Sequence, residues 1–179
     1  MEETIRKEKY DLGIWEHAVI PTGEIPFSAE VRAICEKNGC GMYGTNWACP
    51  PAVGSVEECK ANCLKYDDAL VFTTKTVLES RYDPSLWREA AKHHEQVTDD
   101  VLALVRTAYP DAFTLSTEGC GICASCTYPN APCRFPERMH PAVESFGISV
   151  VELAKKSGVH YINGADSITY FSLILYSTR

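Results

Sequence analysis

The sequence predicts a small α/β domain, with an α+β arrangement also possible, in which helices pack on one small sheet and two cysteine-rich loops lie at one end. Three observations predict this fold class. Helix start signals recur along the chain, and short β-branched or apolar runs alternate with them. Two irregular stretches rich in Cys, Gly and Pro interrupt this alternation, as loops do.

The first half of the chain is predicted to contain two strands and two short helices. Residues 15–20 form a weak strand candidate, and a helix capped by Ser28 follows. Residues 41–54 carry Gly, Asn and Pro and are predicted to be an irregular loop. Ser55 and the glutamate three positions later fit a capping box, so a second helix begins there. The β-branched, apolar run 69–77 is typical of a buried strand.

The second half begins with the longest predicted helix, because Asp83 followed by proline is a strong helix start. A short strand at 112–116 precedes a second loop, rich in Cys, Gly and Pro, at 119–136. Ser149, with a glutamate three positions later, fits a second capping box. The run 168–176 is apolar at nearly every position and is the clearest strand. The buried face of the long helix is predicted to consist of Leu86, Ala90, Val97, Val101 and Leu104.

Composition and charge limit the class of protein. The 179 residues suit a single domain, 1–179, and a hydrophobic fraction of 45% is ordinary for a globular protein. No apolar stretch reaches the roughly 18 residues of a membrane span, and residues 1–10 are charged and lack the apolar core of a secretory signal. The net charge of −7, without a basic block, makes nucleic acid an unexpected partner. We therefore expect a cytoplasmic protein that binds neither membrane nor nucleic acid.

Nine cysteines are the unusual feature of the sequence. Their number is odd, no export signal is visible, and the domain is large enough to build its own core. These facts favour metal binding over a disulfide framework. The first cysteine group consists of Cys35, Cys40, Cys49, Cys59 and Cys63. The second cysteine group consists of Cys120, Cys123, Cys126 and Cys133.

The spacing of the second group predicts a [4Fe–4S] cluster. Cys120, Cys123 and Cys126 are separated by two residues each, which lets successive thiolates face one centre, and Cys133 follows after six more. Gly119 and the glycine after Cys120 allow a tight backbone here. The run resembles that of bacterial ferredoxins, although those have three residues before the fourth cysteine and a proline directly after it. Structural zinc is the alternative, but zinc ligands typically come as two pairs with a longer spacer.

The first group is predicted to hold a second metal centre, for which another [4Fe–4S] cluster is one candidate. Its candidate ligands are Cys35, Cys40, Cys49 and Cys59. Their spacing matches no standard motif, so the prediction depends on their clustering. Cys63 is the best candidate for a buried cysteine that only packs. A centre held by three thiolates would keep one iron open for substrate, and this alternative stays open.

Other side chains near the cysteines have two interpretations each. Tyr43 and Trp47 flank the first cysteine loop, where they either shield a cluster from water or anchor the loop to the core. Arg134 either offsets the negative charge of a cluster or pairs with Glu137 on the surface. His140 follows the second loop and is a candidate acid or ligand.

Two segments resemble the signatures of a family of cysteine-rich predicted metal-binding proteins, found largely in anaerobic bacteria and archaea. The first segment is the stretch 40–51, with the sequence CGMYGTNWACPP. The second combines CGICASC at 120–126 with CRFP at 133–136 and with Pro141. The blocks occur in the order that the family has. We expect the similarity to extend from 31 to 148, with the strand 169–176 beyond it.

The resemblance implies metal binding through these cysteines but supplies no reaction, and Cys59 and Cys63 lie outside the signatures. We expect an iron–sulfur protein that binds one or two [4Fe–4S] clusters and transfers electrons in anaerobic metabolism. Its partner would be a redox protein such as a reductase or a corrinoid protein. A cluster-dependent enzyme with an open iron site in the first group and a zinc-stabilised binding module are the alternatives.

Overall fold

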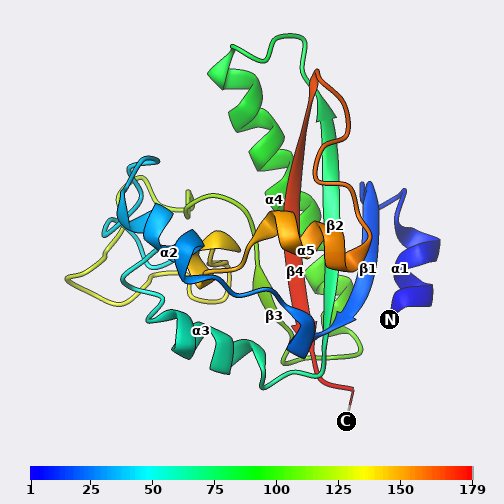
Figure 1. Ribbon diagram of the computed structural model, residues 1–179, viewed down its shortest axis with the longest axis horizontal. Helices are drawn as coiled ribbons and strands as arrows, with labels where there is room; N and C mark the ends of the chain where they lie inside the picture. Colours follow the sequence, from blue (N-terminus) through cyan, green and yellow to red (C-terminus); the bar gives the residue numbers. More distant parts are fainter. Residues whose placement is uncertain (179) are drawn as a thin grey trace.

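The computed structural model describes residues 1–178 and contains a four-stranded sheet in the order β1-β2-β4-β3. The strands are β1 (Glu16–Pro21), β2 (Asp68–Val77), β3 (Phe113–Leu115) and β4 (Ser167–Tyr176). All of these strands pair antiparallel, as in the α+β arrangement that the sequence left open. β2 and β4 pair along their full length and form the tall centre of the sheet in Figure 1. β3 pairs only with residues 173–175 of β4.

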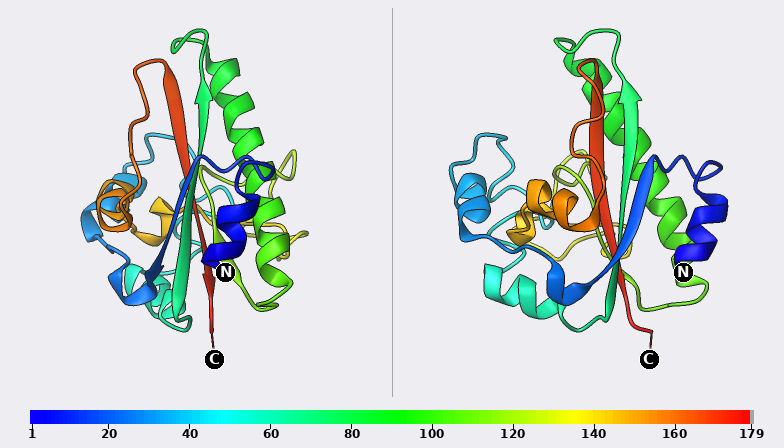
Figure 2. Two further views of the ribbon diagram at one scale, coloured as in Figure 1. Left: turned by 90° about the vertical axis from the view of Figure 1, so that its right-hand side faces the viewer. Right: turned by 45° about the vertical axis from the view of Figure 1, so that its right-hand side comes forward.

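Helices cover both faces of the sheet (Figure 2). They are α1 (Glu2–Glu8), α2 (Ala29–Glu36), α3 (Val56–Cys63), α4 (Pro84–Arg106) and α5 (Val150–Ser157), with short 3-10 turns η1 (Thr22–Glu24) and η2 (Glu144–Phe146). Leu70 and Phe72 of β2 pack against α4 and α1 on one face. Ala69 and Val71 pack against α3, η2 and α5 on the other face. The small sheet with packed helices that the sequence predicts is therefore confirmed.

The same helices differ in character from membrane-spanning helices. Within residues 1–178, none of them has the length and apolar character that a bilayer span requires. The longest, α4, carries charged residues along its exposed side and an apolar stripe on its buried side. That pattern is typical of a helix that packs on one face of a sheet.

The predicted helix starts are present because each depends on a contact within one turn. The side chain of Ser28 caps α2, and that of Asp83 caps α4 by accepting from the N–H of Ser85 at 2.8 Å. The capping box at the start of α3 is complete. Ser55 Oγ accepts from the N–H of Glu58 at 3.2 Å, and Glu58 Oε2 accepts from the N–H of Ser55 at 2.7 Å.

Two details of the N- and C-terminal helices differ from the prediction. Ser149 caps α5, but the carboxylate of Glu152 accepts from Lys155 at 2.7 Å, so the second capping box is only half formed. A lysine one turn away competes for the carboxylate that would complete the box. Helix α1 was not predicted, because its single buried apolar side chain, Ile5, is hidden among charged residues in the sequence.

The long helix α4 buries a polar residue, His94, that the buried face predicted from the sequence did not include. Leu86 and Leu104 are only partly buried, whereas His94 is fully buried. Its ring nitrogens lie 2.9 Å from Thr74 Oγ1 on β2 and 2.8 Å from Ser172 Oγ on β4. Burial lowers the pKa of His94 to about 3, so the ring is neutral at pH 7. The two hydroxyls satisfy the imidazole, which is why the core tolerates it.

The two cysteine loops lie side by side, beyond the β3 edge of the sheet (Figure 1). One connects α2 to α3, and the other connects β3 to η2. The N–H of Ala142, at the end of the second loop, donates to the carbonyl of Ala48 in the first loop at 3.4 Å. The sheet edge thus serves as the platform on which both loops are placed.

Candidate metal centres

The four cysteines of the second group face one narrow hollow. Cys120, Cys123, Cys126 and Cys133 all line it, and its volume is only about 20 Å³. Each of the four residues is partly buried. The remaining walls are mainly apolar or aromatic side chains, among them Trp47 of the first loop. We call this space the second-group hollow.

The thiols of the second group influence one another electrostatically. Burial raises the pKa of the Cys120 thiol, and the nearby thiols of Cys133, Cys126 and Cys123 raise it further. A hydrogen bond from the backbone N–H of Ile122 acts in the opposite direction. Four thiolates in one small space are unfavourable unless a positive centre lies between them, and a metal supplies it.

Backbone contacts hold the long connection between the third and fourth cysteines. Arg134 donates to the carbonyl of Ser125 at 2.9 Å, and Thr127 Oγ1 donates to the carbonyl of Pro132 at 2.8 Å. Arg134 therefore ties the loop to itself, and the predicted surface pair with Glu137 is not among the ion pairs of residues 1–178. The six-residue connection turns back on itself, which brings Cys133 to the same hollow as the other three cysteines.

Only three of the five cysteines of the first group face a common space. Cys35, Cys40 and Cys49 line a hollow of about 510 Å³, which we call the first-group hollow. Burial raises the pKa of the Cys49 thiol to about 11, with Cys40 and Cys35 contributing. Two carboxylates, Glu118 and Glu144, line the same hollow. The donor set there is thus three thiols with carboxylates nearby, which suits a metal or a cluster.

Cys59 and Cys63 lie in the hydrophobic core instead. Both are fully buried on α3. The Sγ atom of Cys59 lies 3.3 Å from the carbonyl of Val53 and 3.6 Å from Arg32 Nη2. Burial raises the pKa of the Cys63 thiol to about 12. The structure therefore separates Cys59 from the three cysteines with which it was grouped, while the packing role predicted for Cys63 agrees with its place in the core.

The two hollows are neighbours because the first loop packs on the second. Trp47 Nε1 donates to the carbonyl of Ala131 at 3.2 Å, and its ring meets that of Tyr128 edge to face with centroids 5.0 Å apart. A side chain at Gly119 would meet Met42, whose flexible side chain would have to move, so the two loops pack closely at this glycine. The thiol of Cys120 also contributes to the raised pKa of Cys49, which shows how near the two groups are.

The comparison with known families finds one matching family. A family model described as "Predicted metal-binding protein (DUF2284)" matches residues 18–176. The chain belongs to this family. Neither the curated proteins nor the solved structures contain a match to it. Membership of DUF2284 states metal binding as a predicted property, and neither the metal nor a reaction follows from it.

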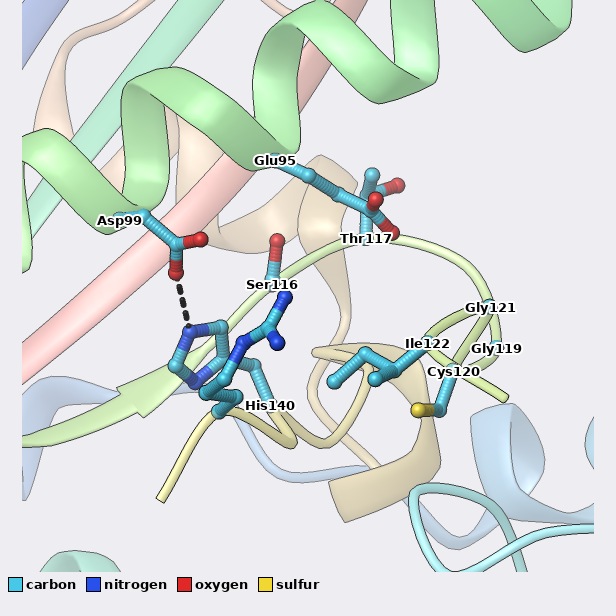
Figure 3. A pocket seen from close by; sticks show the side chains of 10 residues that line it. Glu95, Asp99, Ser116, Thr117, Gly119, Cys120, Gly121, Ile122 and His140 are labelled. Atoms are coloured by element: carbon cyan, nitrogen blue, oxygen red, sulfur yellow. Dashed lines mark hydrogen bonds and ion pairs between the residues drawn. The ribbon is translucent and has the colours of Figure 1, made fainter. Parts of the chain in front are cut away.

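This member of DUF2284 has acidic residues near its cysteines that sequence reasoning missed. Glu95 and Asp99 lie one turn apart on α4 and face a third hollow, of about 90 Å³, next to Cys120 (Figure 3). Asp99 Oδ1 lies 2.9 Å from Nε2 of His140. His140 is thus placed beside the second group, as its position in the sequence predicted, and Asp99 holds its ring. The four-residue spacing on a helix was the signal that could have paired Glu95 with Asp99.

Ligation of a metal by either group would require its side chains to rearrange. Among residues 1–178, no three His, Cys, Asp or Glu side chains are gathered as a preformed metal site. The cysteines of each group nevertheless line a shared hollow, and metal binding orders such loops as it occurs.

Proposed function

We propose that this protein is an iron–sulfur protein with two [4Fe–4S] clusters, one at each cysteine group, and that it transfers electrons in anaerobic metabolism. The observation that carries the proposal is the convergence of Cys120, Cys123, Cys126 and Cys133 on one narrow hollow. A cubane cluster takes four thiolates, and the spacing of the first three is the one that ferredoxin-like loops use.

The walls of the second-group hollow suit an electron-transfer centre. Trp47, Phe135 and Met139 line it together with the cysteines, so they limit the access of water. The N–H of Ile122, which faces the Cys120 thiol, is the kind of donor that tunes a cluster's potential. When bound, the cluster supplies single-electron chemistry, while the chain supplies insulation and hydrogen bonds.

The nearness of the two groups supports transfer between two centres. The first-group hollow and the third hollow share Gly119 as a wall, and the third hollow and the second-group hollow share Cys120. Electrons would enter from a redox partner, such as a reductase or a corrinoid protein. The net charge of −7 favours a partner with a basic docking surface.

A cluster-dependent enzyme is the second candidate, and one observation favours it. The first-group hollow has three thiols and about 510 Å³ of space, which is within the usual range for small-molecule sites of roughly 300–1,000 Å³. A cluster held there by Cys35, Cys40 and Cys49 would leave one iron without a thiolate. Such an iron would be accessible to a ligand in the same hollow.

Metal analysis of anaerobically purified protein tests the proposal. We expect a brown protein with broad absorption at about 400 nm, about eight irons per chain, and equal amounts of iron and acid-labile sulfide. About four irons would restrict the proposal to one cluster. A colourless protein with stoichiometric zinc would replace it with a zinc-stabilised binding module. A spectral change of the cluster on adding a small molecule would favour the enzyme.

A further inference from the structure

A fourth hollow adjoins the first-group hollow and differs from it in character. Its volume is about 350 Å³, and Thr117 and Glu144 line both spaces. Aromatic side chains, including Trp87 and Tyr161, form much of the rest of its wall. We call this space the aromatic hollow. The shared residues make the two spaces neighbours, with Glu144 on the wall of both.

The aromatic hollow exists because the sheet is incomplete at this edge. β3 pairs with residues 173–175 of β4, so on that side no strand among residues 1–178 pairs with residues 167–171. These five residues line the hollow. The opening is therefore built into the strand lengths, and it does not depend on a side chain moving aside.

Both hollows are acidic in character, although burial and the nearby Glu118 raise the pKa of Glu144. Glu118 and Glu144 contribute carboxylates, and no Lys, Arg or His of residues 1–178 lines either space. An anionic ligand would meet repulsion from these carboxylates, whereas a cation would be attracted to them.

Glu118 is held in an uncommon conformation at the junction. Its φ of +55° lies in the left-handed region, which is unfavourable for a residue with a side chain. Its carboxylate accepts a hydrogen bond from the hydroxyl of Tyr170 at 3.0 Å. A strained backbone that fixes a charged group in a hollow is a feature of binding sites.

We propose that the aromatic hollow binds a small organic ammonium ion whose nitrogen carries apolar substituents. Its charge would lie toward Glu118 and Glu144, and its substituents would pack against Trp87, Tyr161 and Tyr170. Aromatic faces attract such cations, most strongly where water is displaced. The site goes beyond the proposed electron transfer, because its walls and carboxylates belong to the chain and need no cluster. A bound ion would lie beside the first cysteine group.

Choline and 3,3-dimethylbutan-1-ol provide a direct test, because the alcohol has the same shape with a neutral carbon in place of the charged nitrogen. Both are titrated into the anaerobically purified full chain, and binding is followed by calorimetry and tryptophan fluorescence. We expect choline to bind at least about tenfold more tightly than the alcohol. Equal affinities, or no binding of choline, would overturn the proposal.

Two variants locate the site, and a third serves as a control. Glu118→Gln and Trp87→Leu should each weaken choline binding by about tenfold. Glu152→Gln, an exposed position on α5 that lines neither hollow, should leave the affinity unchanged. If Glu118→Gln folds poorly, Glu144→Gln takes its place. Unchanged affinity in both carboxylate variants contradicts the proposal. The iron content of the same samples is measured separately. A protein without iron would contradict the proposed clusters, whereas the choline result tests the hollow by itself.

Discussion

The two cysteine groups occupy neighbouring loops but form different kinds of space. The second-group hollow is narrow, has four thiols and is closed by aromatic and apolar side chains. The first-group hollow is some 25 times larger, at about 510 Å³ against about 20 Å³, and combines three thiols with two carboxylates. A closed site with a full set of thiolates favours electron transfer without substrate, whereas an open site with an incomplete set leaves room for a ligand.

The two hollows also differ in how far the neighbouring loop covers them. Trp47 of the first loop helps to close the second-group hollow. The first-group hollow has no equivalent aromatic lid from the second loop; Gly119, which has no side chain, stands there instead. One loop therefore covers its neighbour's centre while its own centre stays open.

The largest effect is expected from the second group. Cys120→Ser, Cys123→Ser or Cys126→Ser should each remove one cluster and lower the free energy of unfolding by on the order of 5 kcal/mol or more, because metal binding is coupled to folding of the loop. Iron analysis and denaturant unfolding under anaerobic conditions measure both quantities. Full metal retention in these three variants would show that the narrow hollow is not a cluster site.

The next largest effect is expected from the first group. The double variant Cys40→Ser with Cys49→Ser should lose half of the iron and keep the spectrum of the second cluster, because Cys120 to Cys133 line a separate hollow. Iron content and electron paramagnetic resonance of the reduced protein provide the measurement. If this variant keeps all of its iron, the first-group hollow holds no cluster. The second-group hollow would then be the metal site, and the first-group hollow would only be a space for a ligand.

Cysteines of the same group should behave differently when they lie in the core. Cys63→Ala should keep all of the iron and lower the free energy of unfolding by about 1–2 kcal/mol, because it leaves a small cavity beside buried side chains. Cys59→Ala is the informative partner, since Cys59 was a candidate ligand by sequence. We expect it to resemble Cys63→Ala, whereas loss of iron from Cys59→Ala alone would return it to the ligand set.

The smallest effect should come from the lid. Trp47→Phe removes the hydrogen bond to the carbonyl of Ala131 and should cost about 0.5–1.5 kcal/mol of stability. The second cluster should then bleach faster in air, because the lid holds its position less firmly, while the first cluster is unaffected. Absorbance decay at about 400 nm, compared with that of Trp15→Phe, measures the change. Equal decay rates would mean that Trp47 anchors the loop without shielding the cluster.

The sequence by itself determined the local features. Ser28, Ser55 and Asp83 start their helices by contacts within one turn, so neighbouring residues carried the information. The two-residue spacing from Cys120 to Cys126 brings these thiols to one hollow for the same reason. The apolar runs predicted β2 and β4, although the antiparallel pairing was only one of two arrangements left open.

Only the tertiary structure decided which cysteines share a space. Cys49 and Cys59 are both candidate ligands in the sequence, yet packing of α3 on the sheet turns Cys59 into the core and leaves Cys49 beside the hollow. Glu118 and Glu144 come together with these thiols because a parallel bridge between Ser116 and Ala142 places the segment after β3 beside the start of η2. Such contacts join segments far apart in the chain. They follow from the packing of whole elements, which no local pattern encodes.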